Sequence, residues 1–280
     1  MNNFKNIKLI SCDLDGTILN FNGKPSEKTI AAINELHARN YILVACSGRP
    51  LHSVPKEIYD LPFDYIIGNN GQEFLDRRSN ETFEKEKLHK DELEMLHNLA
   101  IKHMCISNIH YEGFTYLIMA KRHLLFGIGF NVLNSMRFVF KQRKKSKVKY
   151  STNIKSLKLE DNAKICFVSF ASNLRSLQKE IDTNKKYHSF LVAKNWLEAQ
   201  PIHISKGQAL IDIAKRENID IENTMAFGDG ENDYPMLKAA GIGVAMENGL
   251  DKTKSVAQYI APSFLNDGFA SFVSENLLEN

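Results

Sequence analysis

The chain of 280 residues lacks any run of about 18 apolar residues, the length that a helix needs to cross a membrane. Its N-terminus, MNNFKNIK, also lacks the apolar segment of a signal peptide. We therefore expect neither a membrane span nor a membrane partner, and we expect a cytoplasmic location. A hydrophobic share of 43% beside 25% charged residues is typical of a globular protein with a substantial core.

Cysteine is scarce, and its spacing excludes two kinds of site. The four cysteines, Cys12, Cys46, Cys105 and Cys166, are far apart and form no CxxC pair, so neither a zinc site nor a disulfide framework is indicated. Each lies in an apolar context, which favours reduced thiols in the core. The sequence also has no internal repeat and no low-complexity tract.

The net charge of +3 is small but unevenly distributed. Residues 86–191 contain 19 Lys and Arg against 9 Asp and Glu, whereas the remainder contains 17 against 24. This asymmetry predicts one basic and one acidic unit. Six of the nine residues in 141–149 are basic, which is typical either of a solvated surface or of a nucleic-acid patch. Because no aromatic residue interleaves within the run, we expect a solvated surface and no nucleic-acid partner.

The first 70 residues or so alternate between strand and helix patterns. Continuous apolar runs predict buried strands at Ile7–Cys12, Tyr41–Cys46 and Tyr65–Ile67. Helices are expected at Ser26–Asn40, with Ser26 as the cap, and at Leu51–Tyr59. Apolar strands that alternate with helices indicate a parallel sheet covered on both faces.

This alternation of strands and helices is interrupted and later resumes. Residues 72–85 read as a polar hairpin, 86–191 contain strand-like segments together with helix patterns, and 120–160 give no clear element. Beyond residue 193 the pattern of a helix at Lys206–Arg216 and a strand at Thr224–Phe227 resumes. We therefore predict an α/β fold: a Rossmann-like parallel-sheet core (1–85 plus 192–280) with an inserted α+β domain (86–191).

Two acids follow the first predicted strand, in Asp13-Leu14-Asp15-Gly16-Thr17. Side chains two residues apart on a strand share a face, and Gly16 lets the backbone turn, so both carboxylates can enter one small site. Crowded carboxylates repel one another unless a divalent cation, a shared proton or a reaction centre uses their charge. The alternative is an ordinary acidic turn.

Three further polar segments lie where other elements begin or end. Ser47-Gly48-Arg49 follows the second strand, the run 228–233 (GDGEND) follows the strand at 224–227, and Lys206 begins a helix. Ligands of an open α/β sheet bind outside the carboxyl ends of its strands. The joint order of these segments therefore predicts one site that combines carboxylates, a hydroxyl, an ammonium group and an amide.

These segments resemble the four motifs of the haloacid dehalogenase (HAD) superfamily: DLDGT (13–17), SGR (47–49), a lone Lys206 in HISKGQAL, and GDGENDYPML (228–237). The long insertion between the second and third motifs, with NNG at 69–71, resembles the Cof-type hydrolases, which carry an α/β cap. The tail VAMENG (244–249) is also similar to that subgroup.

The resemblance implies how the acids act. Asp13 would be the nucleophile that forms an aspartyl-phosphate, and Asp15 would protonate the leaving alkoxide and later deprotonate the attacking water. Mg²⁺ would be held by the Asp13 carboxylate, the Asp15 backbone carbonyl and Asp229, with Asp233 in the outer coordination sphere.

The resemblance also implies the phosphate-binding residues. Ser47 would donate to a phosphoryl oxygen together with the amide of Gly48, and the amide near Leu14 would complete the cradle. Lys206 would neutralise charge on the transferred group. Asn232 would hydrogen-bond to phosphate or shape the metal site.

Two neighbours of these motifs have open roles. Thr17 is as consistent with a structural role as with a catalytic one. Arg49 either braces its motif through hydrogen bonds or reaches the substrate.

The function predicted from these observations is a Mg²⁺-dependent phosphatase, a phosphoric monoester hydrolase. Its expected substrates are small phosphorylated metabolites, such as sugar phosphates or phosphorylated cofactors, and the inserted cap would select among them. One alternative is a sugar phosphomutase, which also uses an aspartyl-phosphate. A second is a non-catalytic regulatory or nucleic-acid-binding protein that uses the basic run 141–149.

Overall fold

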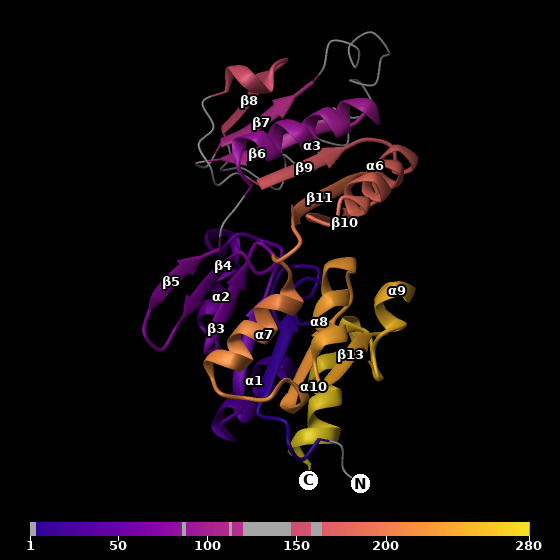
Figure 1. Ribbon diagram of the computed structural model, residues 1–280. Coiled ribbons are helices and arrows are strands. Elements are labelled where there is room, and N and C mark those ends of the chain that lie inside the picture. Colours follow the sequence, from indigo (N-terminus) through magenta and orange to yellow (C-terminus); the bar gives the residue numbers. More distant parts are fainter. Residues whose placement is uncertain (1–3, 86–87, 112–113, 120–146, 158–163, 280) are drawn as a thin grey trace. The chain divides into compact units, whose positions relative to one another are not determined.

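The computed structural model describes residues 4–85, 88–111, 114–119, 147–157 and 164–279 (Figure 1). The chain divides into two compact units, Met1–Lys85 with His203–Asn280, and Glu86–Ile202. Most of the basic run 141–149 lies outside the described residues.

The first unit is built on an eight-stranded sheet with the order β14-β13-β12-β1-β2-β3-β4-β5. The six strands from β14 to β3 are parallel, and β4 and β5 add an antiparallel hairpin beside β3. The strands are β1 (Leu9–Asp13), β2 (Ile42–Cys46), β3 (Tyr65–Gly68), β4 (Glu73–Asp76), β5 (Glu81–Glu84), β12 (Thr224–Gly228), β13 (Ile242–Met246) and β14 (Tyr259–Ala261).

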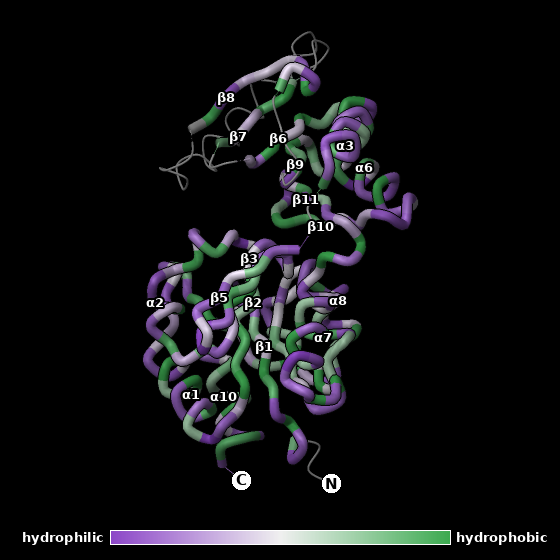
Figure 2. Tube along the Cα trace, turned by 60° about the vertical axis from the view of Figure 1, so that its left-hand side comes forward, coloured by the Kyte–Doolittle hydropathy of each residue, from purple (hydrophilic) through white to green (hydrophobic). Residues whose placement is uncertain are grey.

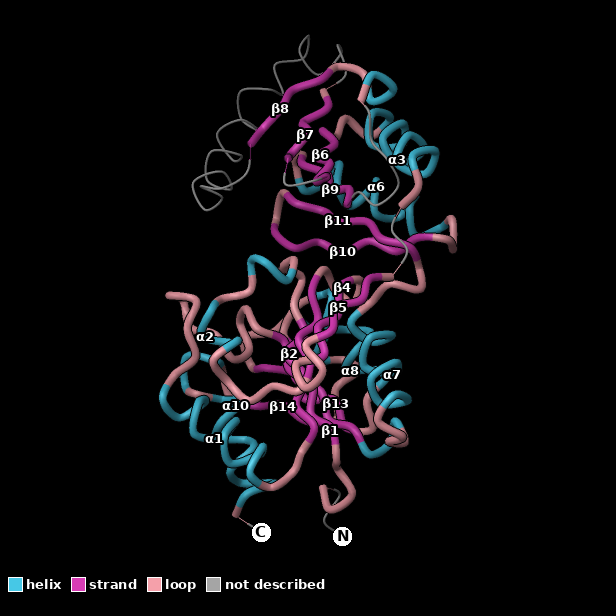
Figure 3. The backbone as a smooth tube through the Cα atoms, turned by 90° about the vertical axis from the view of Figure 1, so that its left-hand side faces the viewer, coloured by secondary structure: helices cyan, strands magenta, loops and turns pink. Residues whose placement is uncertain are grey.

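Helices cover both faces of this sheet (Figure 3). The helices of the unit are α1 (Glu27–Ala38), α2 (Lys56–Tyr59), α7 (Lys206–Arg216), α8 (Tyr234–Ala239), α9 (Asp251–Lys254) and α10 (Gly268–Val273). Apolar side chains of α1 and α10 pack against one face, and those of α7 and α8 pack against the other. Strands β1 and β2 are therefore apolar along most of their length, as Figure 2 shows.

The second unit contains a six-stranded sheet with the order β10-β11-β9-β6-β7-β8. All neighbours are antiparallel except β7 and β8, and α3 and α6 pack on one face. Among the residues that the structure describes, its elements are α3 (Lys90–Lys102), β6 (Ile106–Tyr111), β7 (Phe114–Ile118), β8 (Lys147–Ser151), β9 (Lys164–Val168), α6 (Ala171–Thr183), β10 (Tyr187–Ala193) and β11 (Trp196–Pro201). Because β11 pairs with both β9 and β10, this unit continues beyond residue 192 to Ile202.

The predicted fold class is confirmed, since a mainly parallel sheet and a second mixed sheet are both present. The helix predicted over Leu51–Tyr59 is wrong as a single element. Leu51–Ser53 forms one 3₁₀ turn, and α2 begins only at Lys56. The ring of Pro55 disfavours the helical conformation at the preceding residue, and Val54 is accordingly extended at φ −64° and ψ 135°.

All four cysteines are buried thiols, in keeping with their apolar sequence context. Among the described helices, none combines the length and the apolar character required to traverse a membrane.

We expect Ile33→Ala to lower the free energy of unfolding of the first unit by about 2–4 kcal/mol, because the substitution leaves a cavity between α1 and the sheet. Ile33 is fully buried, whereas the neighbouring Asn34 is exposed. Urea unfolding measures the difference, and Asn34→Ala is the control, with an expected effect within about 0.5 kcal/mol. Equal effects of the two substitutions would contradict this packing.

Candidate active site

The order of the strands brings distant parts of the chain to one edge of the first sheet. From the central strand β1 the chain proceeds to β2 and β3 on one side, and later to β12, β13 and β14 on the other. β1 and β12 are parallel neighbours that end at Asp13 and Gly228. A reversal of strand order between two neighbours opens a crevice at their carboxyl ends. The first predicted motif begins at the end of β1, and the last begins at the end of β12.

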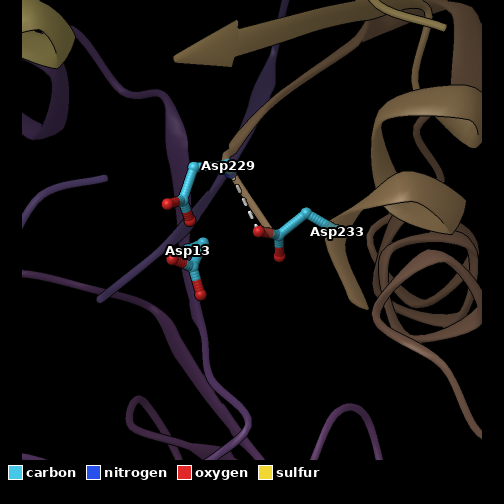
Figure 4. A group of neighbouring side chains, drawn as sticks. All are labelled: Asp13, Asp229 and Asp233. Atoms are coloured by element: carbon cyan, nitrogen blue, oxygen red, sulfur yellow. Dashed lines mark hydrogen bonds between the residues drawn. The ribbon is translucent and has the colours of Figure 1, made fainter. Parts of the chain in front are cut away.

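Three carboxylates from these strand ends form a cluster. Asp13, Asp229 and Asp233 each contribute an oxygen, and these oxygens lie within 4.8 Å of one another. Asp13 comes from the end of β1, whereas Asp229 and Asp233 belong to the loop after β12, and the three side chains converge (Figure 4). Asp13 is thus not part of an isolated acidic turn, because a segment more than 200 residues away supplies the other two acids.

The ammonium group of Lys206 lies inside this cluster. Lys206, the first residue of α7, is fully buried, and its Nζ donates to Oδ1 of Asp13 and, at 2.6 Å, to Oδ1 of Asp233. Burial alone would lower the pKa of Lys206, but the two carboxylates outweigh it and raise the pKa above its ordinary value. Lys206 is therefore a permanent positive charge in the site.

Asp233 organises the loop that carries Asp229. Its Oδ2 accepts the backbone amides of Asp229 at 3.0 Å and of Gly230 at 2.8 Å, while its Oδ1 accepts Lys206. With both oxygens engaged, Asp233 links the Gly-Asp-Gly turn to α7.

One ammonium group does not balance three carboxylates. Burial, and after it the charge of Asp233, raises the pKa of Asp13 well above its ordinary value. The same two causes raise the pKa of Asp229 to about 7. Crowded carboxylate oxygens from distant segments fit a site for a hard divalent ion, which prefers oxygen ligands and offsets the repulsion between them. Asp13 and Asp229 are the residues best suited to hold it.

Asn248 is a site residue that the sequence analysis missed. Its Nδ2 donates to the carbonyl of Gly16 at 2.9 Å and to Oδ2 of Asp229 at 3.2 Å, so it joins the first motif to the last. Gly16 has φ +86°, and a Cβ there would collide with the Asp229 carboxylate. The ENG triplet at 247–249 was the available signal, but nothing in its spacing indicated this contact.

The two residues left with open roles both contact the acids of the first motif. Thr17 Oγ1 donates to Oδ2 of Asp13 at 3.2 Å, so both oxygens of Asp13 are oriented by donors. Arg49 donates to both oxygens of Asp15, with Nε to Oδ2 at 2.7 Å. The Asp15 carboxylate thus lies outside the three-acid cluster and against the second motif.

The predicted phosphate-binding residues lie around the same edge. Ser47 is buried directly after β2, where its Oγ accepts the amide of Arg49 at 3.1 Å and keeps its own hydrogen for another acceptor. Gly48 packs against the side chains of Asn70 and Asn232. Leu14 is buried in the core, and its carbonyl accepts the amide of Leu19 at 2.9 Å, so only its backbone is available to a ligand.

Comparison with known families agrees with this geometry. Residues 10–273 match the model of a family described as haloacid dehalogenase-like hydrolase, which is nearly the whole chain. The chain belongs to the haloacid dehalogenase-like hydrolases. The resemblance drawn from the four motifs, including the Cof-type subgroup with its inserted unit, is confirmed.

Known relatives of this hydrolase carry phosphatase names. It is 27% identical over 274 residues to the 5-amino-6-(5-phospho-D-ribitylamino)uracil phosphatase YcsE of Bacillus subtilis, covering 95% of this chain and 94% of that protein. It is 24% identical over 255 residues to the HMP-PP phosphatase of Klebsiella pneumoniae, covering 89% and 87%. Its fold matches that of a phosphatase of the same superfamily from Bacteroides thetaiotaomicron with a TM-score of 0.80 and 24% identity, over 97% of this chain and 96% of that one.

The raised pKa of Asp229 predicts how metal-free protein responds to pH. Asp229 binds its proton more tightly in the folded hydrolase than in the unfolded chain, so its contribution to stability falls as pH rises from about 4 to 7. Without metal, Asp229→Asn should therefore be more stable than the parent protein at pH 8, by up to about 4 kcal/mol at ~1.4 kcal/mol per pKa unit.

Urea unfolding in EDTA at pH 8 and pH 5 measures this difference, which we expect to shrink at the lower pH. The exposed Asp220 provides the control variant Asp220→Asn, a substitution of the same type away from the cluster. A stability difference for Asp229→Asn that is the same at both pH values would contradict the prediction.

Proposed function

We propose that this hydrolase is a Mg²⁺-dependent phosphatase that acts on phosphomonoesters of small metabolites through an aspartyl-phosphate. The observation that carries the proposal is the position of Lys206 Nζ between Asp13 and Asp233, with the carboxylate of Asp229 in the same cluster. This arrangement combines an oriented carboxylate nucleophile with fixed positive charge, which phosphoryl transfer requires.

Asp13 is the nucleophile in this proposal. Thr17 and Lys206 fix the direction of its two oxygens. One oxygen attacks phosphorus, the ester bond to the leaving alkoxide breaks, and Asp13 becomes an acyl phosphate. Water then attacks phosphorus, inorganic phosphate leaves, and the Asp13 carboxylate is restored.

Asp15 moves the protons of both steps. It gives a proton to the leaving alkoxide and later takes one from the attacking water. Because both of its oxygens accept from Arg49, this ion pair has to open before Asp15 can carry a proton. Arg49 therefore acts in the proposal as a brace for the acid between turnovers.

The other side chains hold the phosphoryl group. Ser47 has a hydroxyl hydrogen to donate, and Lys206 carries a permanent charge, while Asn232 and the amides near Leu14 and Gly48 supply neutral donors. Asp13 and Asp229, with the Asp15 backbone carbonyl, would hold Mg²⁺, and Asp233 would support it from outside the coordination sphere. When bound, the ion supplies charge that offsets repulsion between nucleophile and phosphate.

The substrate class rests on the relatives and on the motifs. The two relatives named above have similar identity to this chain but different phosphorylated compounds in their names, so likeness alone selects no single substrate. We assign the selection of the leaving group to the second unit, as the Cof-type resemblance implies. Measuring phosphate release from a panel of phosphorylated metabolites, with and without Mg²⁺, tests the class. Metal-independent release, or release from none of them, would reject the proposal.

Asp13→Asn should lower turnover of any accepted substrate by more than about a thousandfold, because an amide cannot form the acyl phosphate. The readout is phosphate release by purified protein whose melting temperature has been checked. Asp220→Asn, an exposed substitution of the same type, should keep parental activity. Near-parental turnover by Asp13→Asn would rule out the mechanism.

Asp15→Asn should slow the transfer of the phosphoryl group to Asp13, and should slow the hydrolysis of the aspartyl-phosphate even more, since no group then activates the water. Intact-mass analysis of acid-quenched protein after incubation with substrate should show one added phosphoryl group. The double variant with Asp13→Asn should show none. Phosphorylation that persists in the double variant would place the covalent step on another residue.

A further inference from the structure

The turn that follows β3 has an unusual backbone. Asn69, Asn70 and Gly71 are all left-handed, with φ of 48°, 57° and 100°. Left-handed backbone at a residue other than glycine costs roughly 1 kcal/mol or more and persists where the surroundings determine it. Asparagine accepts left-handed backbone more readily than other residues with a side chain, so the contacts of Asn69 and Asn70, rather than their φ values, show what each side chain does.

The turn is bonded to the second motif through its backbone. The amide of Asn69 donates to the carbonyl of Arg49 at 2.8 Å, and that of Asn70 donates to the carbonyl of Ser47 at 2.9 Å. A Cβ at Gly71 would come within 2.5 Å of the carbonyl oxygen of Ser205, the N-cap residue of α7. The turn therefore touches both the Ser47 segment and the start of the helix that carries Lys206.

The side chain of Asn70 reaches the fourth motif. Asn70 is 1% exposed, and its Oδ1 accepts Nδ2 of Asn232 at 2.8 Å. This bond uses one of the two N–H groups of Asn232 and thereby fixes the plane of the amide and the direction of the second N–H. The side chain of Asn69, in contrast, donates from Nδ2 to Oε1 of Glu73 at 2.5 Å.

We propose that Asn70 is a positioning residue of the phosphate site, which sets the orientation of the Asn232 amide so that its second N–H faces a phosphoryl oxygen. This inference rests on the proposed function, because it takes Asn232 as a phosphate ligand. The left-handed backbone of the turn aims Asn70 at Asn232, while the amides of the turn hold the Ser47 segment.

Glycine variants provide a test that preserves the backbone. Glycine adopts left-handed φ without strain, so Asn70→Gly and Asn69→Gly both remove a side chain and both leave the turn able to form. Only Asn70→Gly removes the bond to Asn232. The probe is inorganic phosphate, as a competitive inhibitor of p-nitrophenyl phosphate hydrolysis.

Asn70→Gly should raise the inhibition constant for phosphate about three- to tenfold, the effect of one misoriented hydrogen bond to an anion. Asn69→Gly should change it less than about twofold. In the Asn232→Ala background, Asn70→Gly should have no further effect, because the group that it orients is absent. Melting temperatures of the two glycine variants should be similar.

Three results would overturn the proposal. An unchanged inhibition constant in Asn70→Gly, or equal changes in both glycine variants, would make the turn merely structural. An undiminished effect of Asn70→Gly in the Asn232→Ala background would mean that Asn70 acts independently of Asn232. If Asn232→Ala itself leaves phosphate inhibition unchanged, the assignment of Asn232 as a phosphate ligand fails, and this inference fails with it. Absence of metal-dependent hydrolysis by the parent protein would instead reject the proposed function.

Discussion

The site depends on one buried ion pair network, in which Lys206 is shared by Asp13 and Asp233. A buried ammonium group is costly unless carboxylates surround it, and buried carboxylates are costly without a cation. Because the two acids come from opposite ends of the chain, the network forms only when β1, the loop after β12 and the start of α7 are all in place. The network therefore requires the folded arrangement of all three segments.

The remaining negative charge gives the site its chemistry. Lys206 donates to Asp13 and Asp233, whereas the carboxylate of Asp229 accepts the neutral amide of Asn248. Burial, and after it the charge of Asp233, raises the pKa of Asp229 to about 7. A cation at this position would relieve the repulsion that burial creates, and would also bring the anionic phosphoryl group within reach of Asp13.

Sequence reasoning was most successful where a residue type is tied to a backbone role. The alternation of apolar strands with helices predicted the parallel sheet, and the motif residues Asp13, Asp229 and Lys206 were predicted to meet and do form one cluster. These residues could be predicted to meet because the carboxyl ends of parallel strands share one edge of the sheet, where ligands bind.

Contacts between distant side chains could not be predicted in this way. Strand β11 contains two polar residues, Glu198 and Gln200, which do not favour a strand in the sequence. In the sheet, the carboxylate of Glu198 forms an ion pair with Lys164 of β9 at 2.7 Å. Likewise, no local pattern indicated that Arg49 would bind Asp15 or that Asn70 would bind Asn232. Each of these partners is set by strand register and strand order, which a single sequence does not specify.

We propose above that Asp13 and Asp229 together hold a cation beside Lys206. A crystal grown with MnCl₂ and measured at the manganese absorption edge tests it most directly. We expect one anomalous peak bonded to oxygens of both Asp13 and Asp229, with Lys206 still contacting Asp13. An absent peak, or a manganese ion that replaces Lys206 between Asp13 and Asp233, would contradict it.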